Sequence, residues 1–212
     1  RTVCTGYAWL VREMAIIAGL ECVIVDGYAR TARSNVGGKG VLNHSWNAVK
    51  LSGRWYVCDA TWASGAVDVT NHMAVHEYND AYFLSDPMQF LRDHYPQDTA
   101  WLLTKDRLSL NEFLNRPLTY RGAYRHGVRS IYPNAMEWEV ERGVPANFSI
   151  APATGTKVGK IELIVRSGSH GRTDLTVTPE ITESSPANFD FYYAFPFSGK
   201  YNVHILINSA FV

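Results

Sequence analysis

Residues 44–62 read HSWNAVKLSGRWYVCDATW, and this stretch predicts an antiparallel hairpin on which the rest of the fold depends. Two apolar-rich runs flank Ser52-Gly53, a dipeptide typical of a tight turn. A two-residue turn at this point places His44 and Asp59 on one face of the hairpin as diagonal neighbours, with Cβ atoms about 7–8 Å apart or somewhat less. That separation allows a hydrogen bond between imidazole and carboxylate, whereas a three-residue turn would put the two side chains on opposite faces.

A predicted helix lies upstream of the hairpin, and Cys4 directly precedes it. Apolar residues recur at helical spacing over residues 7–18, and Gly19 is typical of a helix C-terminal cap. We expect one apolar side of this helix to consist of Leu10, Val11, Met14, Ala15, Ile17 and Ala18. A thiol at a helix N-terminus faces the partial positive end of the helix dipole, which lowers its pKa and favours the thiolate. A buried cysteine that acts as a small hydrophobic residue is the alternative interpretation of Cys4.

Cys4, His44 and Asp59 together make a candidate catalytic group. An orienting carboxylate, an imidazole base and a nearby thiol form an activated nucleophile of the kind used in acyl transfer. Each residue also has an ordinary structural interpretation by itself, since a lone histidine is most often a surface residue or a satisfied core residue. Cys22 and Cys58 fall in predicted strands, and we expect both to be core residues.

The overall composition excludes several classes of protein. Of the 212 residues, 46% are hydrophobic and 13% aromatic, which is enough for a packed core and excludes wholesale disorder. Twenty basic residues balance twenty acidic ones, so neither nucleic acid nor an anionic membrane is a leading candidate partner. No apolar run approaches the roughly 20 residues that span a bilayer. Residues 1–6 contain neither an initiator Met nor the apolar core of a signal peptide, so we expect a processed or truncated piece and assign no compartment.

The chain divides into two parts of different character, and the predicted fold class is α+β. The elements predicted in the first part, besides the helix at 7–18, are strands at 21–26, 44–51 and 55–60, a loop at 28–42, a turn and short helix within 82–94, and a short helix at 108–114. Beyond about residue 120, helical periodicity disappears and short apolar or alternating runs recur between turn residues. They predict six strands of a β-sandwich, at 136–141, 146–151, 160–165, 174–177, 189–195 and 201–207.

Several motifs, in order along the first part, resemble the transglutaminase-like core. They are Val3-Cys4-Thr5-Gly6-Tyr7-Ala8, Gly27-Tyr28-Ala29, His44-Ser45-Trp46-Asn47-Ala48-Val49 and Trp55-Tyr56-Val57-Cys58-Asp59-Ala60-Thr61-Trp62. The family's nucleophilic Cys, base His and orienting Asp correspond to Cys4, His44 and Asp59. The later runs Tyr82-Phe83-Leu84-Ser85-Asp86-Pro87 and His94-Tyr95-Pro96-Gln97-Asp98 are similar to the kyphoscoliosis-peptidase branch, so the resemblance covers about residues 3–117. It implies a papain- or transglutaminase-like core at 1–120, followed by an Ig-like β-sandwich at 121–212.

The resemblance and the candidate triad together predict cysteine-dependent acyl transfer on protein or peptide amide bonds. Cys4 attacks a carbonyl, His44 protonates the leaving amine, and Asp59 fixes the imidazole tautomer. Water resolves the thioester in a peptidase or amidase, and an amine resolves it in a transglutaminase. The peptidase is favoured because the nearer branch is described as peptidase-like. The backbone N–H of Cys4 is the visible candidate donor to the oxyanion, and we expect no cofactor and no metal.

Other functions are open to the same sequence. A catalytically degenerate transglutaminase-like protein would act as an interaction or scaffold module, and an acyl-CoA-dependent acetyltransferase would use a related Cys-His-Asp core. His72 and His76 are spaced four residues apart, but they lack the Glu of the H-E-x-x-H zinc-peptidase motif. No dense Asp/Glu cluster resembles a calcium loop, so the calcium dependence of animal transglutaminases is not expected here.

Overall fold

The computed structural model describes residues 3–68, 73–75, 77–105, 107–168, 174–185 and 187–212. The chain forms two compact units, Arg1–Leu114 and Asn115–Val212. Helices and mostly antiparallel strands are both present, so the fold class is α+β. Among the described residues, no helix has the length and apolar character needed to span a membrane.

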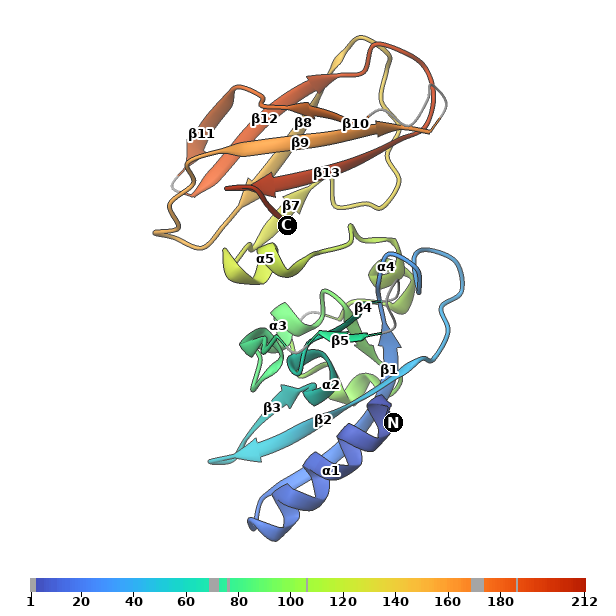
Figure 1. Ribbon diagram of the computed structural model, residues 1–212, viewed down its shortest axis with the longest axis vertical. Helices are drawn as coiled ribbons and strands as arrows, with labels where there is room; N and C mark the ends of the chain where they lie inside the picture. The colour runs from blue at the N-terminus through green and yellow to red at the C-terminus, as the bar shows by residue number, and fades with distance from the viewer. Residues whose placement is uncertain (1–2, 69–72, 76, 106, 169–173, 186) are drawn as a thin grey trace. The chain divides into compact units, whose positions relative to one another are not determined.

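The first unit is built on a four-stranded antiparallel sheet with the order β3-β2-β1-β6. Its strands are β1 (Glu21–Ala29), β2 (His44–Leu51), β3 (Arg54–Cys58) and β6 (His94–Pro96). The helix α1 (Cys4–Ile17) lies along β1 and β2 (Figure 1). The other described elements between residues 60 and 115 are α2 (Ala60–Ala63), β4 (Ala66–Asp68), β5 (Met73–Val75), the 3-10 helix η1 (Asp80–Tyr82), α3 (Pro87–Phe90), the 3-10 helix η2 (Thr99–Leu102) and α4 (Leu110–Asn115).

The β2–β3 hairpin has the register that the sequence predicts. Asn47 pairs with Cys58, and the pairing continues to a turn that contains only Ser52 and Gly53. Both turn residues have positive φ, which matches the right-handed twist of the flanking strands. The two-residue turn therefore sets which side chains share each face of the hairpin.

Asp59 lies just outside the strand in which the sequence placed it, so the predicted strand 55–60 is too long. β3 ends at Cys58, and Asp59 is the N-cap of α2. The reason is local, because Asp59 Oδ1 accepts hydrogen bonds from the backbone N–H groups of Thr61 and Trp62 at 2.8 and 3.2 Å. The side chain thereby satisfies donors that the start of a helix leaves unpaired.

The helix α1 packs on the sheet through small residues, and only part of the predicted apolar side lies in the contact, because Val11 and Ala15 join the buried cluster of the sheet. Ala8 and Ala15 are buried, whereas exposure is 58% for Leu10, 61% for Met14 and 87% for Ile17. The side-chain amide of Asn47 in β2 donates to the backbone carbonyl of Ala8 at 2.9 Å. This hydrogen bond draws the helix close to the sheet, and small side chains at the contact allow that approach.

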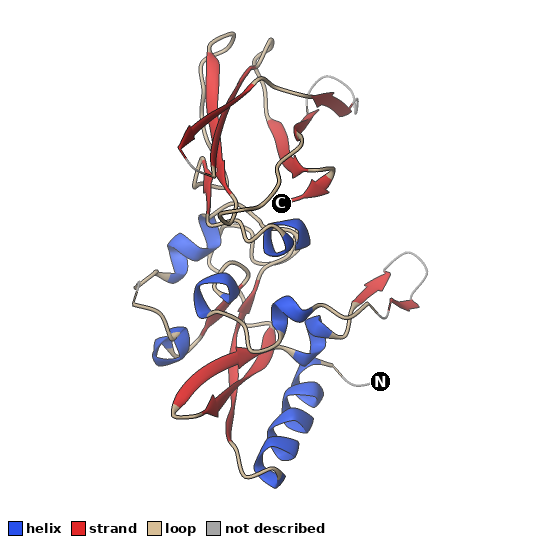
Figure 2. Ribbon diagram, turned by 90° about the vertical axis from the view of Figure 1, so that its left-hand side faces the viewer, coloured by secondary structure: helices blue, strands red, loops and turns tan. Residues whose placement is uncertain are grey.

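The second unit begins with the helix α5 (Arg121–Arg125), and all its described elements beyond α5 are strands (Figure 2). They form two four-stranded antiparallel sheets, with the orders β11-β12-β8-β7 and β10-β9-β13-β14. The strands are β7 (Ser130–Tyr132), β8 (Pro145–Ala151), β9 (Ile161–Ser167), β10 (Asp174–Val177), β11 (Ile181–Ser185), β12 (Asn188–Ala194), β13 (Tyr201–Ile207) and β14 (Ala210–Phe211). Buried side chains from both sheets, among them Ile150, Leu163, Phe191 and Ile207, form one apolar core.

One of the six strands predicted in this unit is wrong. Residues 136–141 form no strand: the N–H of Met136 donates to the carbonyl of Asn115, and Trp138 packs edge-on against Phe148. The apolar residues that suggested a strand are therefore used for packing. The short strands β7, β11 and β14 are absent from the predicted set.

Candidate active site

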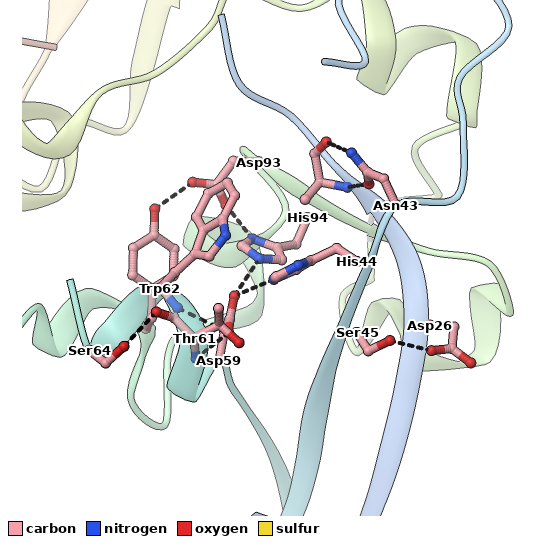
Figure 3. A network of polar contacts seen from close by, with 12 residues as sticks. Asp26, Asn43, His44, Ser45, Asp59, Thr61, Trp62, Ser64, Asp93 and His94 are labelled. Carbon is pink, nitrogen blue, oxygen red and sulfur yellow. Dashed lines mark hydrogen bonds and ion pairs between the residues drawn. The ribbon is translucent and has the colours of Figure 1, made fainter. Parts of the chain in front are cut away.

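His44 and Asp59, the two residues predicted to activate the thiol, form a hydrogen bond (Figure 3). His44 is the first residue of β2 and Asp59 follows the last residue of β3, so the hairpin register brings them together. His44 Nε2 and Asp59 Oδ2 are 2.6 Å apart, and the side chains are 7% and 1% exposed. A buried carboxylate in this position orients the ring and stabilises its protonated form.

Asp59 accepts four hydrogen bonds. Oδ1 caps α2, and Oδ2 accepts from Nε2 of His44 and, at 3.1 Å, from Nε2 of His94. Burial by itself raises the pKa of a carboxyl group, but the hydrogen bonds from the two imidazoles outweigh burial and hold the pKa of Asp59 well below its usual range. Asp59 is therefore an anion at neutral pH.

His94 belongs to the site but is missing from the sequence-based prediction. It is the first residue of β6, where it pairs with Ala29 of β1, and its side chain is completely buried. Its Nδ1 lies 2.5 Å from Asp93 Oδ1, and the hydroxyl of Tyr82 donates to Asp93 Oδ2 at 2.7 Å. Burial lowers the pKa of a histidine, but the two aspartates outweigh it and raise the pKa of His94 to about 9.

The contacts of the two imidazoles distinguish their roles. Both ring nitrogens of His94 face carboxylate oxygens, so this ring offers no nitrogen to a substrate. His44 uses only Nε2, and its Nδ1 makes no hydrogen bond within the described part of the chain. His44 is therefore the ring that is available for proton transfer.

Aromatic rings surround the two histidines. The ring centroid of Trp46 lies 6.3 Å from that of His44 and 5.2 Å from that of His94. Trp62 approaches the same two rings at 5.5 and 4.6 Å, and Phe90 stacks on His94 at 4.1 Å. Apolar walls of this kind keep water away and strengthen the electrostatic interactions inside.

Gly27 makes room for one of these walls. A Cβ added at Gly27 would lie 2.3 Å from the ring of Trp46 and 2.3 Å from the carbonyl oxygen of Tyr95. Any side chain at this position would therefore push the indole away from the histidines. The glycine of the Gly27-Tyr28-Ala29 motif thus has a packing role beside the site.

Cys4 is the first residue of α1 and is partly buried. The N–H groups of Gly6 and Tyr7 donate to the carbonyl of Val3, so the helix begins at the thiol-bearing residue. The described part of the chain gives the Cys4 thiol no hydrogen-bond partner. The structure thus pairs His44 with Asp59 but does not pair Cys4 with His44.

Cys22 and Cys58 are core residues, as predicted. Both are 7% exposed and pack together with Ala15 and Val49. Burial raises the pKa of both thiols, that of Cys58 to about 12 with a further contribution from Cys22. Since the thiolate is the reactive form, neither is a suitable nucleophile near neutral pH.

The three ligand atoms of His44, Asp59 and His94 lie within 4.8 Å of one another, close enough for a metal ion. However, Asp59 Oδ2 already accepts from both rings, and His94 lies between two carboxylates, which favours the imidazolium form. A metal needs neutral imidazole, so these contacts favour a hydrogen-bonded network. His72 and His76, the pair considered for zinc, lie outside the described residues.

Several known proteins are similar to this chain, although no family model matches it. Kyphoscoliosis peptidase of Mus musculus is 40% identical over 135 residues, 63% of this chain and 20% of that protein. Hillarin of Drosophila melanogaster is 32% identical over 138 residues, 58% of this chain and 17% of that protein. Lim and transglutaminase domain protein ltd-1 of Caenorhabditis elegans is 28% identical over 159 residues, 68% of this chain and 22% of that protein.

This chain is similar to transglutaminase-like proteins of the kyphoscoliosis-peptidase branch. It spans about a fifth of the length of the relatives it matches. These similarities confirm the resemblance to the kyphoscoliosis-peptidase branch that the motifs around Cys4, His44 and Asp59 indicated.

Proposed function

We propose that the chain is a cysteine-dependent acyl-transfer enzyme on protein or peptide amide bonds, with Cys4 as nucleophile, His44 as base and Asp59 as orienting residue. The observation that carries this proposal is the 2.6 Å hydrogen bond between His44 Nε2 and Asp59 Oδ2, which leaves Nδ1 for the thiol. The position of Cys4 at the start of a 14-residue helix supports it, because the helix dipole favours a thiolate there. The fold that goes with this function is a papain- or transglutaminase-like core at 1–120 and an Ig-like β-sandwich at 121–212.

The reaction has two halves. The Cys4 thiolate attacks the amide carbonyl, the backbone N–H of Cys4 donates to the oxyanion, and His44 gives its proton to the leaving amine as the thioester forms. Water then gives a proton to His44 and attacks the thioester, which releases the acid and the thiol. An amine in place of water would give transamidation. Hydrolysis is preferred because the similar mouse and human proteins are named peptidases.

A catalytically degenerate interaction module is the second candidate. The observation that favours it is that the Cys4 thiol makes no hydrogen bond within the described residues, His44 included. In that case the hydrogen-bonded pair His44–Asp59 would serve only the fold, and binding would be the function of the chain.

Thiol alkylation separates the two candidates. The rate of iodoacetamide labelling is measured for each cysteine between about pH 5 and 9 by peptide mapping, in the wild type and in His44→Ala. If the chain is an enzyme, Cys4 should be labelled far faster than Cys22 and Cys58 near neutral pH. His44→Ala should then slow the labelling of Cys4 alone. His204→Ala, a change in the second unit, is the matched control and should leave the labelling unchanged. Slow and equal labelling of Cys4 with or without His44 would rule out the enzyme.

A further inference from the structure

His94 has a carboxylate on each side. Its Nδ1 is 2.5 Å from Asp93 Oδ1 and its Nε2 is 3.1 Å from Asp59 Oδ2. An ionised carboxylate only accepts hydrogen bonds, so both ring nitrogens must carry a hydrogen for both contacts to form. The geometry is therefore that of an imidazolium cation, held in a completely buried position.

The same oxygen of Asp59 serves both imidazoles. Oδ2 accepts from Nε2 of His44 and from Nε2 of His94, and the two ring centroids are 5.3 Å apart (Figure 3). A fixed positive charge at that distance opposes a second positive charge on His44. It also compensates the two buried carboxylates, which would otherwise repel one another.

We propose that His94 is a positioning residue. It keeps a permanent positive charge next to Asp59 and orients Asp59 Oδ2 toward His44. The same charge lowers the affinity of His44 for its proton. The inference rests on the proposed function, since it concerns the base of that reaction. A base whose pKa lies too far above the working pH releases its proton to the leaving group reluctantly, so the limit favours turnover.

The groups that face His94 come from four places in the first unit. They are the carboxylates of Asp59 and Asp93, the imidazole of His44 and the phenol of Tyr82, whose hydroxyl donates to Asp93. The rings of Phe90, Trp46 and Trp62 complete the surroundings and carry no charge. Loss of the His94 cation would leave His44 beside carboxylates alone, and the pKa of His44 should rise.

The test is an NMR titration of the His44 ring in a Cys4→Ala background, where the thiol does not couple to it. His94→Phe preserves the stack on Phe90 without charge, and His94→Gln is uncharged but keeps a donor. We expect either change to raise the pKa of His44 by about 1–2 units, whereas the control His204→Ala leaves it unmoved. An unchanged or lower His44 pKa would overturn the proposal, since a purely structural role predicts no rise.

A second measurement needs no substitution at the site. Ring nitrogen shifts of the unsubstituted chain at about pH 7.5 should show both nitrogens of His94 protonated, and a neutral His94 would overturn the proposal. These readouts are independent of turnover. A failure of Cys4 to react would count against the proposed function, while the His44 shift would still decide the role of His94.

Discussion

Raising the pH is expected to weaken the fold through His94, because this ring keeps its proton in the folded state and loses it on unfolding. The pKa of His94 is raised to about 9 in the folded state, against about 6.5 in an unfolded chain. Between these two pH values the folded state binds more protons than the unfolded state. The contribution of His94 to the free energy of unfolding is therefore fully present below about pH 6.5 and is lost as the pH rises toward 9. Integrated from about pH 6.5 to 8.5, the loss is about 2 kcal/mol.

Urea denaturation at a series of pH values measures this loss. To remove the second imidazole of the site, the comparison is made between His44→Gln and the double variant His44→Gln/His94→Phe. The difference in unfolding free energy between them should shrink by about 2 kcal/mol from about pH 6.5 to 8.5. The buried thiols contribute equally to both variants and cancel. A difference that stays constant over this interval would show that His94 is not held as a cation, and the reasoning about the site would fail.

Four further predictions concern single substitutions. Cys4→Ala should abolish turnover of any peptide substrate without changing thermal melting. Cys58→Ser should instead cost about 1–3 kcal/mol of stability, because its hydroxyl is buried in an apolar cluster. Turnover and thermal melting measured on both variants separate the two effects. Asp59→Asn should lower turnover by orders of magnitude, because an amide can hold the wrong imidazole tautomer, and kinetics at saturating substrate would detect it. Gly27→Ala should destabilise the fold by about 3 kcal/mol, because the added Cβ would lie 2.3 Å from the backbone oxygen of Tyr95, which cannot move away without disturbing the sheet. Gly159→Ala, with one contact at 3.4 Å, is its control in urea denaturation.

The contact between His44 and Asp59 was predictable from the sequence because one local feature determines it. The dipeptide Ser52-Gly53 selects a two-residue turn, and the turn fixes the register for both strands. No long-range information is needed, so a single sequence is sufficient. The end of β3 was misplaced by a residue or two because a helix cap at Asp59 competes with strand continuation.

The place of His94 could not be predicted in the same way. It depends on β6 pairing with β1, two strands that are more than sixty residues apart in the chain, and three residues carry no usable periodicity. The packed side of α1 was predicted only in part, for a related reason. Periodicity reports where apolar residues recur, but the hydrogen bond from Asn47 to the carbonyl of Ala8 decides which side approaches the sheet.

Asp59 connects elements that would otherwise be free to move separately. Its backbone N–H donates to the carbonyl of Tyr82, its own carbonyl accepts from Ala63, one carboxylate oxygen starts α2, and the other holds two imidazoles. The end of a strand, the start of a helix and the site therefore share one residue as their common junction. Protonating this carboxyl would release the helix cap and both rings in the same event, so the site should lose its geometry all at once in acid. Amide hydrogen exchange at Thr61 and Trp62, whose N–H groups depend on the cap, would then report on the integrity of the site from outside it.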